Sequence, residues 1–211
     1  MTLVCFAVKE EAAAFKRQAG ASARLHIVVT GMGRRNAQQA LRDALASFSP
    51  KLVLSCGFAG GLDPALPGGA VVFDADAEAG LGPALLAAGA RPARFHCHDR
   101  VAATAAEKGA MRQATGADAV EMESGAIRAV CRERNIPSAT VRVILDTAGE
   151  DLPIDFNALM SPDYRLDGGK LARALLTSPG AIPGLLRLQR QTRAAGQSLA
   201  RVLAAILGNF N

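Results

Sequence analysis

Residues 119–146 decide the fold. Within them, Ala119-Val120-Glu121-Met122-Glu123-Ser124 is followed, after a helix-length gap, by Val141-Arg142-Val143-Ile144-Leu145-Asp146. Two apolar runs of strand length with a helix between them are typical of a parallel sheet, whose ligands bind beyond the carboxyl ends of the strands. Glu123 and Asp146 each stand where an apolar run ends. A buried carboxylate is costly unless it binds something, so the pair predicts a ligand site; helix-capping or salt-bridged acids are the alternative.

Strands and helices alternate along the rest of the chain. Apolar runs predict strands at 3–8, 25–30, 52–56, 69–73, 119–122 and 139–145, and helical spacing predicts helices at 10–17, 36–48, 81–88, 104–113 and 124–134. This order predicts a three-layer α/β fold, with a mixed, mostly parallel central sheet flanked by helices. We expect this domain to span residues 1–163. A helical C-terminal extension at 164–211 is expected to pack on the same domain or on a partner.

Composition narrows the class of protein. The chain has 211 residues, half of them hydrophobic, which suits one large folded domain and argues against disorder. No apolar run is long enough to span a membrane, and charged residues interrupt the N-terminal apolar stretch too early for a signal peptide. The four cysteines are dispersed and form no Cys-x-x-Cys pair, which is typical of reduced thiols in a cytoplasmic protein.

The net charge of +5 is concentrated in the tail. Residues 168–211 contain no acid, whereas the rest of the chain has 18 basic and 19 acidic residues and so a net charge of −1. A general nucleic-acid binder would also need aromatic side chains for stacking, but there is no Trp and one Tyr. We therefore expect no nucleic-acid partner. The basic residues of the tail are Lys170, Arg173, Arg187, Arg190, Arg193 and Arg201.

The tail also predicts an amphipathic helix that starts at Pro183. An apolar stripe at three- and four-residue steps would pack on the chain's own domain or on a second subunit. The alternative is that residues 184–211 lie on an anionic membrane surface, which would make a cytoplasmic protein peripheral at the inner membrane. The stripe consists of Leu185, Leu188, Thr192, Ala195, Leu199, Val202 and Ile206.

Glycine turns follow two of the predicted strands. Gly31-Met32-Gly33 is a weak signal, because such turns often only link a strand to a helix. Gly57-Phe58-Ala59-Gly60-Gly61 is a stronger one, since three glycines in five residues allow a ligand to approach the backbone closely; a tight turn without a ligand is the alternative. If five strands run parallel, these turns and the acids meet at one rim of the sheet.

In combination these motifs resemble the methylthioadenosine/S-adenosylhomocysteine nucleosidases of the purine nucleoside/uridine phosphorylase superfamily. The resemblance runs from about Leu3 to Gly149. The tail, with Pro183 before a Leu/Arg-rich helix, most resembles the hopanoid-associated branch, whose members remove adenine from adenosylhopane. The matching stretches, in the family's order, are Ala7-Val8-Lys9-Glu10-Glu11, Thr30-Gly31-Met32-Gly33-Arg34-Arg35-Asn36-Ala37, Cys56-Gly57-Phe58-Ala59-Gly60-Gly61-Leu62, Val120-Glu121-Met122-Glu123 and Arg142-x-x-x-Asp146.

The resemblance implies a role for each matched residue in breaking a C–N glycosidic bond. Asp146 matches the acid that protonates N7 of the purine, a task that needs a raised pKa. Glu123 matches the glutamate that binds the ribose hydroxyls. Glu11 matches the general base for water, with Glu10 as the neighbouring alternative. Met122 matches the residue under the sugar, and the expected substrate-binding set also includes Gly33, Gly57, Phe58, Ala59, Glu121 and Leu145.

The nucleophile is the next question. Family phosphorylases bind phosphate with an Arg after the first strand and another at the end of the third, whereas here these positions fall among Lys9, Glu10 and Glu11 and near Ser55. Carboxylates repel a phosphate dianion, so we expect hydrolysis by water without a cofactor. Phosphorolysis is the alternative, with Lys9, Arg34, Arg35 and Ser55 as the candidate anion or water site. Arg34 and Arg35 are equally compatible with a solvated helix N-terminus.

Several residues depart from the family pattern. Phe58 replaces a small hydroxyl residue and Leu145 replaces a serine, which favours a bulky, apolar 5′-substituent such as a lipid. The segment that normally supplies the stacking aromatic is short, leaving Phe95, His96 and His98 as candidates. The two histidines have no second His/Cys cluster to complete a metal shell, so we expect no metal. A non-catalytic nucleoside-binding protein is the remaining alternative, and relatives imply a homo-oligomer.

Overall fold

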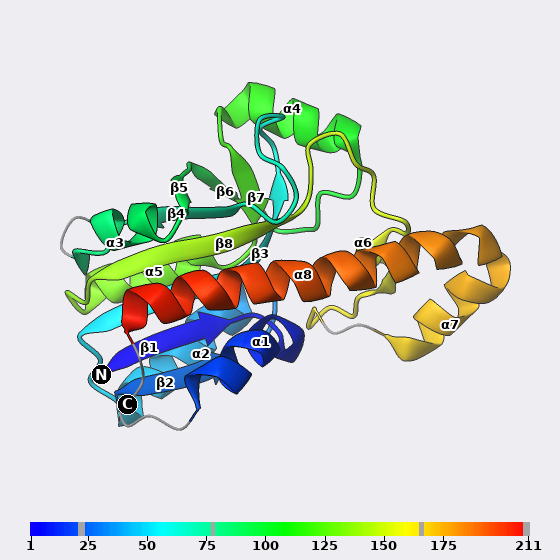
Figure 1. Cartoon of the computed structure of the whole chain (residues 1–211). Helices are drawn as coiled ribbons and strands as arrows, with labels where there is room; N and C mark the ends of the chain where they lie inside the picture. Colours follow the sequence, from blue (N-terminus) through cyan, green and yellow to red (C-terminus); the bar gives the residue numbers. More distant parts are fainter. Residues whose placement is uncertain (21–23, 77–78, 165–166, 209–211) are drawn as a thin grey trace.

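The computed structural model describes residues 1–20, 24–76, 79–164 and 167–208 and has a single mixed sheet at its centre (Figure 1). Strand β1 (Thr2–Phe6) lies between β2 (Leu25–Val29) and β3 (Leu52–Gly61). The order continues through β8 (Ser138–Asp146), β4 (Val71–Ala75) and β5 (Arg91–Pro92). Strands β1, β2, β3 and β8 are parallel, whereas β4 is antiparallel to β8. The prediction of a mixed, mostly parallel sheet is confirmed.

Helices cover both faces of this sheet (Figure 1). Helices α1 (Lys9–Ala19) and α8 (Ile182–Leu207) pack on one face, and α2 (Arg34–Ser47) and α5 (Ser124–Glu133) pack on the other. Side chains of a strand alternate between the faces, and β1 shows this directly. Val4 and Phe6 join the α1–α8 core, while Leu3 and Cys5 join the α2–α5 core. Three layers therefore form, as expected.

Three further elements lie at the carboxyl end of the central parallel strands (Figure 1). Strand β6 (Phe95–Cys97) pairs with β7 (Ala119–Glu121), and α4 (Ala105–Thr115) connects them. A capping box at Thr104 and Glu107 starts α4, and Gly116 ends it in the left-handed conformation, so local sequence fixes its length. The other helices are α3 (Gly82–Ala87), α6 (Phe156–Leu159), α7 (Gly168–Thr177) and a 3₁₀ turn at Pro179–Ala181.

Two expectations at the glycine-rich segment are wrong. Strand β3 does not end at Cys56 but continues to Gly61, because Phe58 still pairs with β8 and the last two glycines pair with β7. Strand β7 is antiparallel to β3, so the five strand ends do not all run parallel. Val120 of β7 lies opposite Gly60 of β3, and the residues that follow Val120 lie beside earlier residues of β3, toward Gly57. This reversal carries Glu123 back to the centre of the sheet.

The tail forms the predicted helix, but its two halves differ. The C-terminal half of α8 is buried on the chain's own domain through residues that include Ala195, Leu199 and Leu203. The N-terminal half extends beyond the sheet, together with α7 (Figure 1). None of the described helices is both long and apolar enough to cross a bilayer. The domain boundary expected at residue 163 stays a prediction.

Candidate active site

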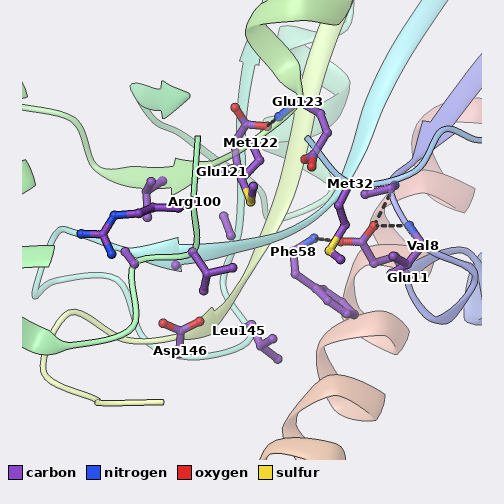
Figure 2. Close-up of a pocket in the computed structure, with 16 residues that line it drawn as sticks. Val8, Glu11, Met32, Phe58, Arg100, Glu121, Met122, Glu123, Leu145 and Asp146 are labelled. Carbon is purple, nitrogen blue, oxygen red and sulfur yellow. Dashed lines mark hydrogen bonds between the residues drawn. The ribbon is translucent and has the colours of Figure 1, made fainter. Parts of the chain in front are cut away.

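A cavity of about 230 Å³ lies where β3, β7 and β8 end (Figure 2). Figure 2 shows Glu123 and Glu11 toward one side of it and Asp146 toward the other, with Met122 between. The cavity is lined mainly by apolar side chains and backbone, with four carboxylates and one guanidinium. The lining residues are Ala7, Val8, Glu11, Met32, Phe58, Ala59, Gly60, Arg100, Val101, Ala102, Val120, Glu121, Met122, Glu123, Leu145 and Asp146.

Arg142 organises the acids on one side of the cavity. It lies in the middle of β8 and is fully buried, so its charge needs partners. Its Nη2 donates to Glu121 Oε2 at 2.6 Å and to Glu123 Oε2 at 3.3 Å. Burial disfavours the guanidinium, but the surrounding carboxylates more than offset this and hold the pKa of Arg142 above its usual range. Arg142 therefore stays cationic and fixes the position of both acids.

Glu121 is a saturated acceptor. Besides Arg142, its carboxylate accepts the backbone N–H groups of Glu123 at 2.9 Å and Ser124 at 2.8 Å, and the Ser124 hydroxyl at 2.7 Å. Burial raises the pKa of Glu121, but Arg142 and these donors outweigh it and bring the pKa below its usual range. The ionised Glu121 thus holds the turn that leads into α5, and its oxygens are already occupied.

The buried carboxylate of Glu123 has fewer hydrogen-bond donors than that of Glu121. Its Oε1 accepts the N–H of Gly33 at 2.9 Å, and its Oε2 lies 3.3 Å from Arg142. Gly33 has φ +85°, and any Cβ there would meet the Tyr164 ring at 3.2 Å, so the turn needs glycine to present this N–H. Burial, together with the charges of Glu121 and Glu11, outweighs Arg142 and raises the pKa of Glu123 to about 7. Neighbouring glutamates therefore have opposite pKa shifts.

Glu11 is held by backbone groups of two elements. Its Oε2 accepts the N–H groups of Ala7 at 2.9 Å and Val8 at 3.2 Å, and its Oε1 accepts the N–H of Phe58 at 2.8 Å. Burial raises the pKa of Glu11 in spite of these donors and of Arg142. Gly57 makes room for the carboxylate, since a Cβ at residue 57 would lie 2.6 Å from Glu11 Oε1. Exposed Glu10 lies outside the cavity.

Asp146 forms an ion pair with Lys108 of α4, a fully buried lysine. The Lys108 ammonium also donates to the carbonyl oxygens of Thr147 at 3.0 Å and Glu150 at 2.7 Å, so all three of its N–H groups have acceptors. Burial raises the pKa of Asp146, and Lys108 counteracts this shift without abolishing it. Lys108 thus sets both the position and the proton affinity of this carboxyl group.

Comparison with known proteins places this geometry in a family. The sequence profile of the phosphorylase superfamily matches residues 7–96 and 87–177. The chain belongs to the phosphorylase superfamily. A 5′-methylthioadenosine/S-adenosylhomocysteine nucleosidase of Anoxybacillus flavithermus is 27% identical over 169 residues, covering 64% of this chain and 72% of the relative.

Solved structures show that the whole phosphorylase-superfamily fold is present. Futalosine hydrolase of Helicobacter pylori matches with a TM-score of 0.72 at 14% identity, covering 98% of this chain and 96% of that one. The 5′-methylthioadenosine/S-adenosylhomocysteine nucleosidase of Campylobacter jejuni matches with a TM-score of 0.70 at 16% identity, covering 98% and 97%. At these identities the similarity shows the fold alone.

Most of the substrate residues predicted for this superfamily member lie at the cavity. Phe58, Ala59, Met122 and Leu145 line it, whereas Gly33 and Gly57 stand behind the carboxylates and support them. Their roles toward a substrate stay predictions. The stacking candidates Phe95, His96 and His98 do not line the cavity.

The residues expected to form an anion site are not brought together. Lys9 and Arg35 are exposed and do not line the cavity. Arg34 is paired with Asp99 at 3.1 Å and donates to the Cys97 carbonyl oxygen at 2.7 Å. Ser55 is buried, and its hydroxyl accepts from Arg142 at 3.2 Å.

Several site residues escaped the sequence analysis, and three of them matter most for the chemistry of the site. Met32 of the first glycine turn and Arg100 both line the cavity, and Lys108 holds Asp146. The Arg100 guanidinium donates to Glu107 at 2.6 Å. A signal for Lys108 does exist in the sequence, because it lies three residues from both Ala105 and Met111, on the inward face of the predicted helix. That pattern alone does not identify the partner.

Proposed function

We propose that this chain hydrolyses the N-glycosidic bond of a purine nucleoside and releases adenine. The observation that carries the proposal is that three carboxylates, each held by a different set of groups, line one cavity: Glu11, Glu123 and Asp146. Bond cleavage builds positive charge on the sugar and negative charge on the departing base. Such a reaction needs anions near the sugar and an acid near the base.

The geometry supports a separate role for each of the three carboxyl groups. Asp146, with its raised pKa, would give its proton to N7 as the C–N bond breaks. Glu123, across the cavity, would accept hydrogen bonds from the ribose hydroxyls and favour the cationic sugar (Figure 2). Glu11 would orient a water molecule and take its proton as the water oxygen bonds to the anomeric carbon. The products are free adenine and the sugar with a new hydroxyl group.

The charges around the cavity favour water over phosphate. A phosphate dianion beside Glu11 and Glu123 would meet two carboxylates. Among the described residues, two guanidinium groups at the site are already engaged, Arg142 by Glu121 and Glu123 and Arg100 by Glu107. Phosphorolysis would require one of these ion pairs to open.

The apolar wall supports a large 5′-substituent. Phe58 and Leu145 line the cavity and are packed against the core that includes α8. Neither offers a hydrogen bond to a polar 5′-group, so selectivity should come from the apolar area that the substrate buries. Adenosine that carries a 5′-linked lipid, such as adenosylhopane, is the specific candidate for this site.

The decisive assay measures adenine release in phosphate-free buffer from adenosine, methylthioadenosine and 5′-alkyl adenosines of increasing chain length. We expect turnover without phosphate and a rise in kcat/KM with chain length. Strict dependence on phosphate, with ribose 1-phosphate formed, would reject hydrolysis. Glu11→Gln should abolish turnover, whereas Glu10→Gln, at the exposed neighbouring position, should not. Tight nucleoside binding without any turnover would indicate a non-catalytic nucleoside-binding protein instead of an enzyme.

A further inference from the structure

Exposed apolar side chains gather at one place on the chain, the hairpin between α7 and α8. Leu176 is 84% exposed, Ile182 44% and Leu186 53%. The fourth exposed large apolar residue of the described chain is Leu86 of α3, at 55%. No residue of α7 is buried. We call residues 176–186 the apolar tip.

Cations flank this tip on both helices. Lys170 and Arg173 precede Leu176 at three-residue steps, so the three lie along one face of α7. On α8, Ile182, Leu186 and Arg190 are four residues apart and also share a face. Among the described residues, none of the flanking cations forms an ion pair with a carboxylate. Residues 168–208 contain no Asp or Glu. The flanking cations, all exposed, are Lys170, Arg173, Arg187, Arg190 and Arg193.

The hairpin projects from the sheet (Figure 1) and contacts the rest of the chain at Gly184 and Gln191. Gly184 lies so close to Pro153 that a Cβ at residue 184 would come within 2.7 Å of the Pro153 Cβ. Gln191 donates to Glu150 at 3.5 Å. These contacts fix the direction of the hairpin, while the side chains of Leu176, Ile182 and Leu186 stay exposed.

We propose that the apolar tip docks on an anionic phospholipid surface. A helix rises about 1.5 Å per residue, so Arg187 and Arg190 stand roughly 7 and 12 Å along α8 from Ile182. Interfacial segments bury their apolar side chains about 5–10 Å into the headgroup and acyl boundary. Inserted residues Ile182 and Leu186 would then leave the arginines at the level of the lipid phosphates.

Charge decides between this occupant and a second copy of the chain. Two copies that met through their apolar tips would bring together two sets of five flanking cations, which would repel one another at contact. An anionic bilayer supplies both an apolar layer for the tip and phosphates for the cations. The inference does not depend on the proposed reaction, because docking needs no substrate.

Vesicle co-sedimentation of the full chain tests the inference directly. We expect binding to phosphatidylcholine vesicles that contain about one-third phosphatidylglycerol, and weak binding to phosphatidylcholine alone. Raising the salt should weaken the binding. Leu176→Ser with Ile182→Ser should lower the affinity by about tenfold or more, whereas Leu86→Ser, at an exposed leucine of α3, should not.

The contribution of the cations is tested with a second pair of variants, one at the tip and one elsewhere as its control. Arg187→Gln with Arg190→Gln should lower the affinity for anionic vesicles by about tenfold, since each interfacial cation contributes appreciably. Arg132→Gln with Arg134→Gln removes the same charge from exposed positions elsewhere and should leave binding unchanged. Lack of binding to anionic vesicles, or equal losses in test and control variants, would overturn the inference. So would a concentration-dependent dimer, measured by sedimentation without lipid, that Leu176→Ser abolishes.

Discussion

At the residue scale, the distinguishing feature is that carboxylates within one site are placed in different electrostatic environments. Arg142 and three further hydrogen bonds keep Glu121 ionised, whereas Glu123, two residues later, shares the same guanidinium at a longer distance and has one backbone donor. Asp146 has an ammonium group as its partner instead. Such divergence among nearby acids is how one site can hold both an acid and an anion.

The pH dependence of catalysis should report the Glu123 environment. Because its pKa is raised to about 7, Glu123 becomes protonated as the pH falls through neutrality and no longer favours a cationic sugar. We expect kcat/KM to fall about tenfold per pH unit below pH 7. Glu123→Gln should lose most activity and move the acidic limb away from pH 7, while Glu10→Gln should leave the limb where it is. If the acidic limb lay near the ordinary pKa of a glutamate, the raised pKa of Glu123 would be wrong.

Stability should depend on the same group. The folded protein binds the Glu123 proton more tightly than the unfolded chain does, so the free energy of unfolding should fall as the pH rises from about 4.5 to 7. In Glu123→Gln this part of the pH dependence should disappear. Thermal denaturation of both proteins across this range measures the difference, and parallel curves would count against the raised pKa.

Lys108 acts through Asp146. Replacing it in Lys108→Met removes the ammonium that counteracts burial, so the pKa of Asp146 should rise further. If Asp146 donates its proton in the reaction, the alkaline limb of kcat/KM should then move to higher pH. The variant should also lose about 3 kcal/mol of stability, because a carboxylate is left buried without its partner. A destabilised enzyme with an unshifted alkaline limb would show that Lys108 is structural only.

At the scale of elements, the site depends on how closely β3 approaches its neighbours. Gly57 sits opposite Arg142 in the β3–β8 pairing and has no side chain to separate Arg142 from Glu11. Further along β3, a register shift at Ala59/Gly60 brings Gly60 opposite Asp146. The glycines therefore serve the packing of strands and carboxylates.

Two glycine variants separate close packing from helix propensity. Gly57→Ala should lower stability by about 2 kcal/mol and impair turnover, because its Cβ would overlap Glu11. Gly109→Ala lies inside α4 with open space around its Cβ, so it should raise stability by about 0.5–1 kcal/mol. Chemical denaturation gives both values. Equal effects of the two changes would show that the contacts at Gly57 are relaxed.

At the scale of the whole molecule, the C-terminal helix has two environments along one continuous element. Leu199 and Leu203 of α8 are fully buried with Phe15 of α1 and the strands, whereas Leu186 is exposed. The tail is thus part of the core at one end and a projecting surface at the other.

Leucine truncations along α8 test this division. Leu203→Ala should lower the free energy of unfolding by about 2–5 kcal/mol, since it opens a cavity in the core. Leu186→Ala should change it by less than about 0.5 kcal/mol. Urea titration of both variants measures the contrast. Comparable small losses would mean that α8 is not part of the cooperative unit.

The sequence by itself determined the order of the main strands and helices and the three-layer class, because hydrophobic periodicity and caps are local signals. It also brought Glu11, Glu123 and Asp146 forward as candidates, through the resemblance to a family. It misjudged the end of β3 and the direction of β7, since strand pairing depends on residues far away in the chain.

Only the tertiary structure decided which charges meet. The contacts of Lys108 with Asp146, and of Arg142 with Glu121 and Glu123, join separate elements. Electrostatic energies change steeply over a few ångströms once side chains are buried, so proton affinity is a property of the assembled site. For the same reason, the exposure of the apolar tip follows from where α8 leaves the sheet, which its periodic sequence does not specify.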